Sequence, residues 1–368
     1  MRAGIFAAAL ALVMVTAGCG GGTNSTTGSG GGGNSSVYVL GPNTNAVLGF
    51  SQNSSGALIP FTTAPTSNTG SVPVAMVLHP SLKLAFIANN ADGTITICVR
   101  DTSSGILTVP PLPPGVLNPP PPIIAGANPI AMAMTPNGNF VYVLNQGSNS
   151  IAEFSVDLPN NTLVALGSLN IGAGFPGALL TVSPDSRFLY VSSPTTGQIG
   201  MATIGSTGTL SPGAAFTVGS SPTFMVVDPQ VRFLYVTNPA TNSVRAFSLN
   251  NGAISTEVTG SPFATGTNPS AMAINSSGNF LLVTNQGSNS VSGFSVSNGA
   301  LAAVPGSPFN TGVGPSFVVF DKANSFVYIA DQGSRDVAAY QLTGTQLRSL
   351  VGAPFGVGTS PTWIVTSP

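Results

Sequence analysis

One short segment near the C-terminal end gathers charged side chains that could act together on a substrate. The sequence DQGSRD brings Asp331, Arg335 and Asp336 within six residues, in a chain with only nine Lys and Arg and ten Asp and Glu. An Asp can take a proton from water, and an Arg can stabilise the oxyanion that forms at an attacked carbonyl group. We therefore name these three residues as candidate catalytic residues. The alternative is a solvated pair of opposite charges in a surface loop.

Polar segments of the same kind recur along the chain. They read GPNTNA, NNADG, NQGSNS, SPTTGQ, NPATNS, NQGSNS and DQGSRD in chain order. Asn and Gly satisfy tight-turn geometry, and amides and hydroxyls also suit a neutral ligand such as a saccharide or a lactone. The candidate ligand-binding residues are Asn89, Asp92, Asn145, Asn149, Asn238, Asn285 and Asn289.

Several classes of chemistry lack the residues they need. The sequence contains no G-x-S-x-G elbow, phosphate loop or cysteine cluster, and it has a single histidine. A zinc site of the usual kind needs several His or Cys ligands, so we expect no metal and no cofactor. The net charge is −1 and the basic residues are scattered, which argues against a nucleic-acid partner. Cys98 alternates with apolar residues in TITICV and is expected to be buried.

A repeat supplies the elements that must position these residues. Each unit begins with a proline and a short apolar run, followed by a turn and an aromatic-Val-Tyr-Val strand. The leading prolines are Pro73, Pro129, Pro176, Pro222, Pro269, Pro315 and Pro361, spaced by 56, 47, 46, 47, 46 and 46 residues. Four alternating segments per unit predict an all-β, seven-bladed β-propeller with four antiparallel strands in each blade.

The two chain ends are each incomplete and complement one another. Residues 361–366 supply a first strand with nothing after it, and VYVL at Val37 supplies a second strand with nothing before it. We expect the C-terminal strand to close blade 1 by pairing with the N-terminal strands, so that residues 37–368 form a single domain.

The repeat also assigns His79 a structural place. Its counterparts are Thr135, Ser183, Asp228, Asn275, Asp321 and Ser367. All of these residue types can cap a turn, so His79 is expected in a hairpin turn, on the face opposite the polar loops.

The longest unit contains a proline-rich insertion, residues 109–122. Proline lacks an N–H group and cannot join a β-ladder, so we expect a loop between blades 2 and 3. A rigid flap beside the central opening and a tolerated insertion are both open interpretations.

The N-terminal residues predict export. Arg2 precedes an apolar run from Ile5 to Val15, and small residues lead into Cys19. We expect residues 1–18 to be a signal peptide and Cys19 to be lipidated, with residues 19–36 as a Gly- and Ser-rich tether. The membrane is then a partner through the lipid, and the protein lies in the cell envelope, at the outer membrane, cell surface or periplasm. It would be secreted if Cys19 is not lipidated.

At Leu234–Asn238 the chain reads LYVTN, and its units resemble the YVTN-repeat, lactonase-type propellers related to 6-phosphogluconolactonase and muconate-cyclising enzymes. The resemblance implies a seven-bladed propeller and lactone chemistry, which in members depends on His, Arg and Glu side chains at the channel. No position of this sequence is matched to that set. The sequence therefore predicts an extracytoplasmic binding or scaffold module for carbohydrate, envelope or protein ligands, and the alternative is a lactone hydrolase.

Overall fold

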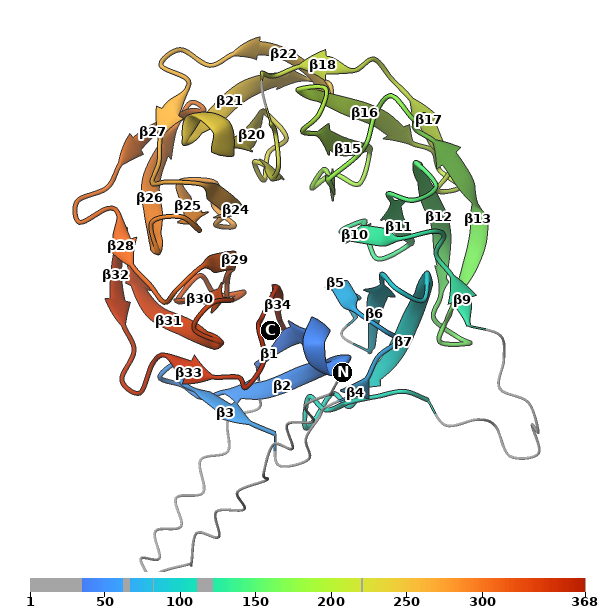
Figure 1. Ribbon diagram of the computed structural model, residues 1–368, viewed down its shortest axis with the longest axis horizontal. Coiled ribbons are helices and arrows are strands. Elements are labelled where there is room, and N and C mark those ends of the chain that lie inside the picture. Colours follow the sequence, from blue (N-terminus) through green and yellow to red (C-terminus); the bar gives the residue numbers. More distant parts are fainter. Residues whose placement is uncertain (1–34, 62–66, 82, 111–121, 220, 368) are drawn as a thin grey trace, which may run out of the picture. The chain divides into compact units, whose positions relative to one another are not determined.

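Seven antiparallel sheets are arranged as blades around a central axis in the computed structural model, which describes residues 35–61, 67–81, 83–110, 122–219 and 221–367 (Figure 1). We number the blades 1 to 7, starting with the blade that holds the N-terminal strands. The innermost strands, in blade order, are β34 (Trp363–Thr366), β5 (Pro73–Leu78), β10 (Pro129–Met134), β14 (Leu179–Val182), β19 (Met225–Val227), β24 (Pro269–Ile274) and β29 (Pro315–Phe320). The repeat therefore predicted the fold class correctly.

The second strand of each blade is apolar along almost its whole length. These strands are β1 (Ser36–Gly41), β6 (Leu84–Asn89), β11 (Phe140–Asn145), β15 (Phe188–Ser193), β20 (Phe233–Asn238), β25 (Phe280–Asn285) and β30 (Phe326–Asp331). Each lies between two strands of its own sheet and between two neighbouring blades, so side chains on both of its faces are buried. A strand covered on both faces loses the usual apolar-polar alternation.

The outer strands complete the blades. The third strands are β2 (Ala46–Gln52), β7 (Thr94–Arg100), β12 (Ser150–Asp157), β16 (Gln198–Ile204), β21 (Ser243–Asn250), β26 (Ser290–Ser297) and β31 (Asp336–Thr343). The fourth strands are β3 (Leu58–Pro60), β8 (Leu107–Thr108), β13 (Thr162–Asn170), β17 (Leu210–Pro212), β22 (Ala253–Glu257), β27 (Ala300–Ala303) and β32 (Gln346–Ser349). Two 3₁₀ turns, η1 (Pro42–Thr44) and η2 (Pro239–Thr241), are the helical elements of the described residues.

Six blades contain one short strand more than the four expected. These strands are β4 (Ser67–Asn68), β9 (Ile123–Ile124), β18 (Phe216–Thr217), β23 (Phe263–Ala264), β28 (Phe309–Asn310) and β33 (Phe355–Gly356), and each pairs with the third strand of its blade. In blade 6 the segment expected as one outer strand is interrupted by the turn Pro305 to Pro308. Proline cannot donate to the ladder, so the outer edge divides into two pieces.

The chain ends close blade 1 as predicted. β34 pairs antiparallel with β1, with Tyr38 opposite Val365 and Leu40 opposite Trp363. The buried Arg100 of blade 2 joins this closure to the next blade, since its Nε donates to the Tyr38 hydroxyl at 2.7 Å and its Nη2 to the Ser367 hydroxyl at 3.2 Å. The ring therefore lacks an open sheet edge at this point.

In four blades the Tyr of the second strand donates a hydrogen bond to a glycine carbonyl of the following blade. The hydroxyls of Tyr142 and Tyr190 donate to the carbonyls of Gly208 and Gly252, at 2.8 and 2.7 Å, in the outer hairpin of the following blade. These glycines have positive φ, and a Cβ on Gly252 would lie 2.4 Å from the ring of Phe188, so no larger residue fits. The aromatic-x-Tyr pattern thus indicates blade-to-blade packing.

The structure tests the expectation for Cys98 but not those for the proline-rich and N-terminal segments. Cys98 in β7 is fully buried, as expected. The proline-rich insertion, residues 109–122, falls largely outside the described residues, as do the proposed signal peptide, Cys19 and nearly all of the tether. Within the part of the chain that the structure describes, no helix is long and apolar enough to cross a membrane.

Candidate functional site

The three candidate catalytic residues lie on one hairpin of blade 7. Asp331 ends β30 and Asp336 begins β31, and the two residues are directly opposite each other across the strand pair. Arg335, in the turn between them, has a left-handed φ of 61°. The structure therefore brings together two carboxyl groups and one guanidinium group at the end of this blade.

The two carboxyl groups differ in exposure. Asp331 is fully buried, and its Oδ2 accepts hydrogen bonds from Thr311 Oγ1 at 2.8 Å and from the Gly312 N–H at 2.9 Å. Burial, more than the nearby charge of Asp336, raises the pKa of Asp331 to about 7. Asp336 is only partly buried, and burial also raises its pKa. It accepts a hydrogen bond from Ser334 Oγ at 3.1 Å.

The Arg335 side chain is exposed. Among the described residues, no ion pair joins its guanidinium to Asp331 or Asp336. The hairpin therefore presents an unpaired cation next to a partly exposed carboxyl group whose pKa is raised. Such an arrangement can accept a proton and bind a developing negative charge.

The repeat provides an internal reference for this hairpin. The corresponding loops of blades 3 and 6 both read NQGSNS, and the blade 7 loop reads DQGSRD. The loops differ at positions 331, 335 and 336 and nowhere else. Blade 7 thus has two facing carboxyl groups where its siblings have an amide and a hydroxyl, and an Arg at a left-handed position where they have Asn. Like charges opposite each other and a left-handed Arg both destabilise a fold.

The asparagines at the ends of the second strands are buried inside the blades. Asn285 donates through Nδ2 to Ser290 Oγ at 3.1 Å and to Ser292 Oγ at 2.9 Å. Asn145 donates to the Ala125 carbonyl at 2.8 Å. Asn89 and Asn238 are also buried at the equivalent positions. These four candidate ligand-binding side chains point into the blades and are not exposed to solvent.

The other three candidate ligand-binding residues lie nearer the surface. The Asn289 Oδ1 accepts a hydrogen bond from the Gly314 N–H of the next blade at 2.9 Å. The Asp92 carboxylate accepts one from the Ser71 N–H. Asn149 is half-buried at a left-handed position. Asn289 and Asp92 therefore hold neighbouring chain segments together, and all three keep part of their surface near solvent.

His79 occupies the hairpin turn expected from the repeat. Its ring is 5% exposed, with Nδ1 2.8 Å from Ser81 Oγ and Nε2 3.1 Å from the Gly138 carbonyl of the next blade. Burial lowers its pKa, which favours the neutral ring. Both ring nitrogens have partners within the protein, so His79 links two blades.

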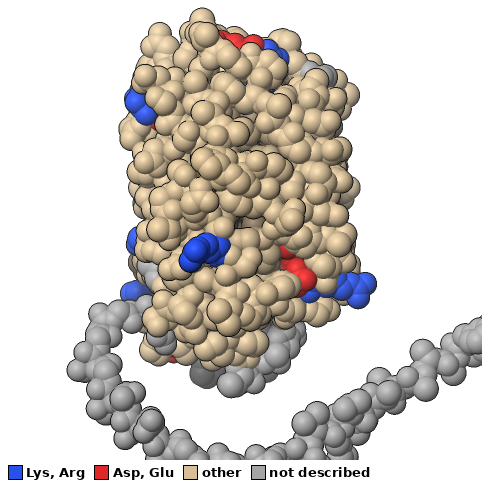
Figure 2. Space-filling model, turned by 90° about the vertical axis from the view of Figure 1, so that its left-hand side faces the viewer, with Lys and Arg blue, Asp and Glu red and all other residues tan. Residues whose placement is uncertain are grey.

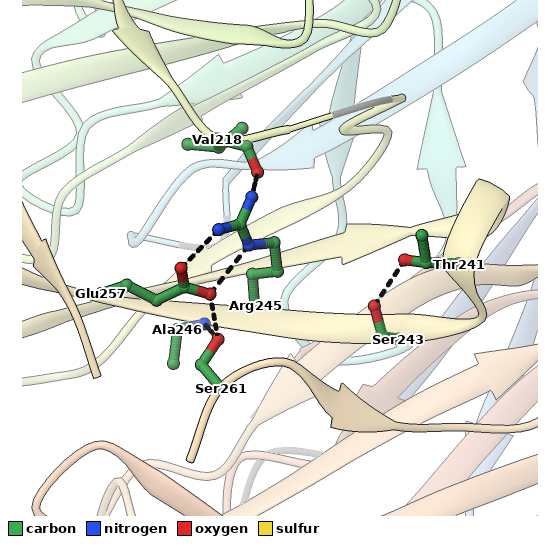
Figure 3. A network of polar contacts seen from close by, with 7 residues as sticks. All are labelled: Val218, Thr241, Ser243, Arg245, Ala246, Glu257 and Ser261. Carbon is green, nitrogen blue, oxygen red and sulfur yellow. Dashed lines mark hydrogen bonds and ion pairs between the residues drawn. The ribbon is translucent and has the colours of Figure 1, made fainter. Parts of the chain in front are cut away.

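A second charged cluster lies in blade 5. Figure 3 shows Arg245 and Glu257 facing each other, with Ser261 against the carboxylate and the Val218 carbonyl on the far side of the guanidinium. Arg245 Nε lies 2.8 Å from Glu257 Oε1, and Ser261 Oγ donates to the same oxygen at 2.6 Å. The Arg245 hydrogen bond holds the pKa of Glu257 below its usual range. These charges satisfy each other, which indicates a structural pair.

The centre of the ring is filled by aromatic side chains that the sequence analysis missed. The ring of Phe317 lies 4.3 Å from that of Trp363 and 5.7 Å from that of Phe224, measured between centroids. Trp363 Nε1 donates to the Met76 carbonyl on the innermost strand of the neighbouring blade at 2.9 Å. The residue two positions after the leading proline supplies this layer, and in blades 2, 3, 4 and 6 it is Ala. Comparing that position between the units would have revealed the layer.

A cavity of about 730 Å³ lies in the channel beside this aromatic layer. Its rim includes turn residues between first and second strands, such as Pro80, Pro136 and Ser276. It therefore opens on the face opposite the blade 7 hairpin. Its walls come from the innermost strands, at Val77, Ala133, Thr181, Val226, Ala273, Val319 and Val365.

Charges are sparse on the rest of the surface. In Figure 2, Lys and Arg (blue) and Asp and Glu (red) appear as isolated spots on an otherwise uncharged face. Among the described residues, no group of three or more His, Cys, Asp or Glu is placed to hold a metal ion.

Comparison with known proteins supports one family across the whole propeller. The family model described as lactonase, 7-bladed β-propeller, matches residues 36–223, 176–263 and 213–365. A 6-phosphogluconolactonase of Pectobacterium atrosepticum is 25% identical over 167 residues, which is 44% of this chain and 48% of that protein. The chain thus aligns with about half the length of this curated relative.

Solved structures show the same fold at low sequence identity. A Bacteroides uniformis protein provisionally assigned as a 6-phosphogluconolactonase superposes with a TM-score of 0.78 at 16% identity, covering 91% of this chain and 100% of that one. The periplasmic gluconolactonase of Pseudomonas aeruginosa gives 0.70 at 17% identity, covering 91% and 99%. Hydrazine synthase of Kuenenia stuttgartiensis gives 0.58 at 18%, covering 79% and 88%. At these identities the superpositions establish the fold and do not establish an activity.

Proposed function

Because this chain belongs to the lactonase family of seven-bladed β-propellers, we propose that it hydrolyses lactones at the blade 7 hairpin. One observation carries the proposal: this loop departs from its sibling loops only at Asp331, Arg335 and Asp336. Each departure costs stability and adds a group that can act on a carbonyl compound. Costly departures of this kind, together with raised carboxyl pKa values, are typical of functional sites.

The geometry suggests a role for each residue. Asp336 is the carboxyl group within reach of solvent, so it takes a proton from the attacking water as the water oxygen bonds to the lactone carbonyl carbon. Arg335 stabilises the oxyanion of the tetrahedral intermediate. The ring C–O bond then breaks, the proton returns to the leaving alkoxide, and a hydroxy acid is released. Asp331 is a positioning residue behind Asp336, since it is fully buried.

The substrate proposed for this site is an uncharged sugar or aromatic lactone. A phosphorylated lactone would require a cluster of Lys or Arg side chains. The hairpin offers only Arg335, and the face drawn in Figure 2 shows only scattered Lys and Arg side chains. The phosphate-bearing substrate named for the relatives is therefore the weaker candidate.

The location of the activity is part of the same proposal. Lipidation of Cys19 after removal of residues 1–18 would hold the protein in the cell envelope, as the sequence predicts. Envelope fractionation of cells labelled with a palmitate analogue tests this prediction. Loss of label in Cys19→Ala is the expected result, and an unlabelled wild-type protein would refute it.

The activity is tested with the full chain and a panel of neutral lactones, including glucono-δ-lactone and dihydrocoumarin, by following acid release at constant pH. We expect turnover that falls at least tenfold in Asp336→Asn and in Arg335→Ala. Ser148→Ala, at an exposed position of the sibling loop in blade 3, is the matched control and should retain full activity. Hydrolysis that is absent in the wild type, or equal in all variants, would refute the proposal.

A binding or scaffold module for carbohydrate, envelope or protein ligands is the second candidate. It is favoured by the amide-rich loops, where the side chains of Asn149 and Asn289 stay near solvent. A glycan array and envelope pull-downs with the full chain test it. Binding lost on substitution of Asn149 and Asn289, in a protein without lactone turnover, would place this function first.

A further inference from the structure

The channel cavity lies opposite the blade 7 hairpin and takes no part in the proposed hydrolysis. We propose that it is a second site, which binds one small uncharged molecule carrying an aromatic ring. Three features carry this inference: the volume of the cavity, the chemistry of its walls and floor, and the side chains that close it on one side.

The volume suits a small molecule. About 730 Å³ falls within the range of roughly 300 to 1,000 Å³ that ligand pockets occupy. The cavity is bounded on all sides by the innermost strands of the blades, which are held in place by the rest of each sheet. The site is thus preformed, which limits the entropy lost on binding.

The walls are apolar and mostly small. Alternate residues of the innermost strands face the channel, and in six blades these are Val77, Ala133, Val226, Ala273, Val319 and Val365. Asp321 and Lys322, at the rim, are the ionisable residues among those lining the cavity. Apolar surface around an open space is unfavourable in water, and an apolar ligand relieves that cost. A phosphate or a charged sugar would meet no cluster of charges there.

The floor favours an aromatic ligand. Phe224, Phe317 and Trp363 form a layer across the channel, with tilted and edge-to-face contacts between their rings. Ala75, Ala131 and Ala271 are fully buried at equivalent positions in other blades and leave room for these rings. Trp363 is fixed by the hydrogen bond from its Nε1 to the Met76 carbonyl. A ring entering from the open side can make offset or edge contacts with this rigid layer.

The single tryptophan of the chain reports on the site directly. Trp363 is the only Trp in the sequence and lies on the floor of the cavity. We would titrate the full chain with the neutral probe N-phenyl-1-naphthylamine, which absorbs light at the wavelengths that Trp emits. The expected result is saturable quenching of Trp363 with energy transfer to one probe per chain.

Two filling variants and a control test the location. Ala133→Phe and Ala273→Phe place a ring inside the cavity and should weaken probe binding at least tenfold. Ala302→Phe, on the exposed face of the outer strand β27, should leave it unchanged. Equal affinity in all three variants would overturn the proposal, because the probe would then be bound elsewhere on the surface.

A competition experiment on the unmodified protein covers the case in which the filling variants fail to fold. Benzyl alcohol and indole should displace the probe, and glucose and inorganic phosphate should not. Displacement by glucose, or failure of both aromatic competitors, would overturn the assignment of an aromatic ligand. A wild-type chain that shows no saturable energy transfer from Trp363 would refute the site altogether.

Discussion

The polar loops of blades 6 and 7 occupy equivalent places in the same repeat and differ sharply in their electrostatics. In blade 6, the neutral Asn285 donates a hydrogen bond of 3.1 Å to the hydroxyl of Ser290 opposite it. In blade 7, Asp331 and Asp336 face each other with raised pKa values. The backbone of the hairpin is shared, so the difference lies in three side chains. Blade 6 has the neutral loop that it shares with blade 3, and blade 7 has charged side chains at three positions of that loop.

The charged pair of blade 5 sharpens this contrast. There Arg245 and Glu257 neutralise each other, and the pKa of Glu257 is lowered. Arg335 forms no such pair with any residue that the structure describes, although two carboxyl groups lie in its own hairpin. Charge by itself therefore does not distinguish a functional residue in this protein. Our proposal for blade 7 rests instead on charge without an ion pair, at positions that are neutral in blades 3 and 6.

The largest expected effect concerns pH. Folding raises the pKa of Asp331 from 3.8 to about 7, so the folded protein binds this proton more tightly than the unfolded chain does. The resulting stabilisation is fully present below the unfolded pKa of 3.8 and is lost as the pH rises through about 7. We expect Asp331 to lower the free energy of unfolding by about 2.5 kcal/mol between pH 5 and pH 8. Urea unfolding gives the free energy of unfolding of wild type and of Asp331→Asn at both pH values. The decrease between pH 5 and pH 8 should be larger in wild type by this amount. An equal decrease in the two proteins would contradict the contrast between the blades.

The reciprocal substitution in blade 6 should give its loop the pH-dependent stability expected for blade 7. Asn285→Asp puts a carboxyl group in a fully buried position, and we expect a loss of about 1 to 2 kcal/mol at pH 8, with a smaller loss at pH 5. Asn289→Asp, in the exposed turn of the same loop, is the control and should change stability little. Thermal unfolding at the two pH values provides the measurement. An equal loss in both variants would show that burial is not the cause.

A smaller effect concerns the left-handed turn position. Arg335→Asn puts there the residue found in blades 3 and 6, and we expect the free energy of unfolding to rise by about 0.5 to 1 kcal/mol. Asn289→Arg should lose a similar amount, since it also removes the acceptor for the Gly314 N–H. Denaturant midpoints of the two variants test this pair. A stabilising Asn289→Arg would contradict the comparison.

The smallest effect is expected for Asp336→Ser. Removing this carboxyl group takes away a like charge from beside Asp331, which lowers the pKa of Asp331. The free energy of unfolding at pH 8 should rise by about 0.5 kcal/mol. Because the pKa of Asp331 falls, the pH at which stability is lost should also move downward. The pH dependence of the unfolding midpoint reports it. A shift to higher pH would have the wrong sign.

Much of the fold could be predicted from the repeat, because each predicted strand could be compared with the equivalent segments of the six other units. Blade number, end closure and the turn position of His79 followed from equivalent positions. The extra outer strands did not, since they contain two residues each and depend on where proline interrupts the ladder. Burial of Asn89, Asn145, Asn238 and Asn285 was also missed, because an amide at a strand end looks the same in sequence whether it faces water or a hydroxyl.

The site could be predicted only in part. Charge alone selected Asp331, Arg335 and Asp336 as candidates, and the structure places them on one hairpin. The aromatic layer was missed because Phe224, Phe317 and Trp363 are far apart in the chain, and their contact depends on closure of the ring. These contacts join side chains from different blades. The alternation of residues along a single strand does not show which side chains will meet in the channel.

The most direct test converts the blade 7 loop to the sequence of its siblings. The triple variant Asp331→Asn, Arg335→Asn and Asp336→Ser turns DQGSRD into NQGSNS. Lactone turnover and thermal unfolding at pH 8 would be measured on the same preparations of wild type and variant. We predict a more stable protein that has lost turnover. A variant that keeps its turnover, or that is less stable than wild type, would contradict the account.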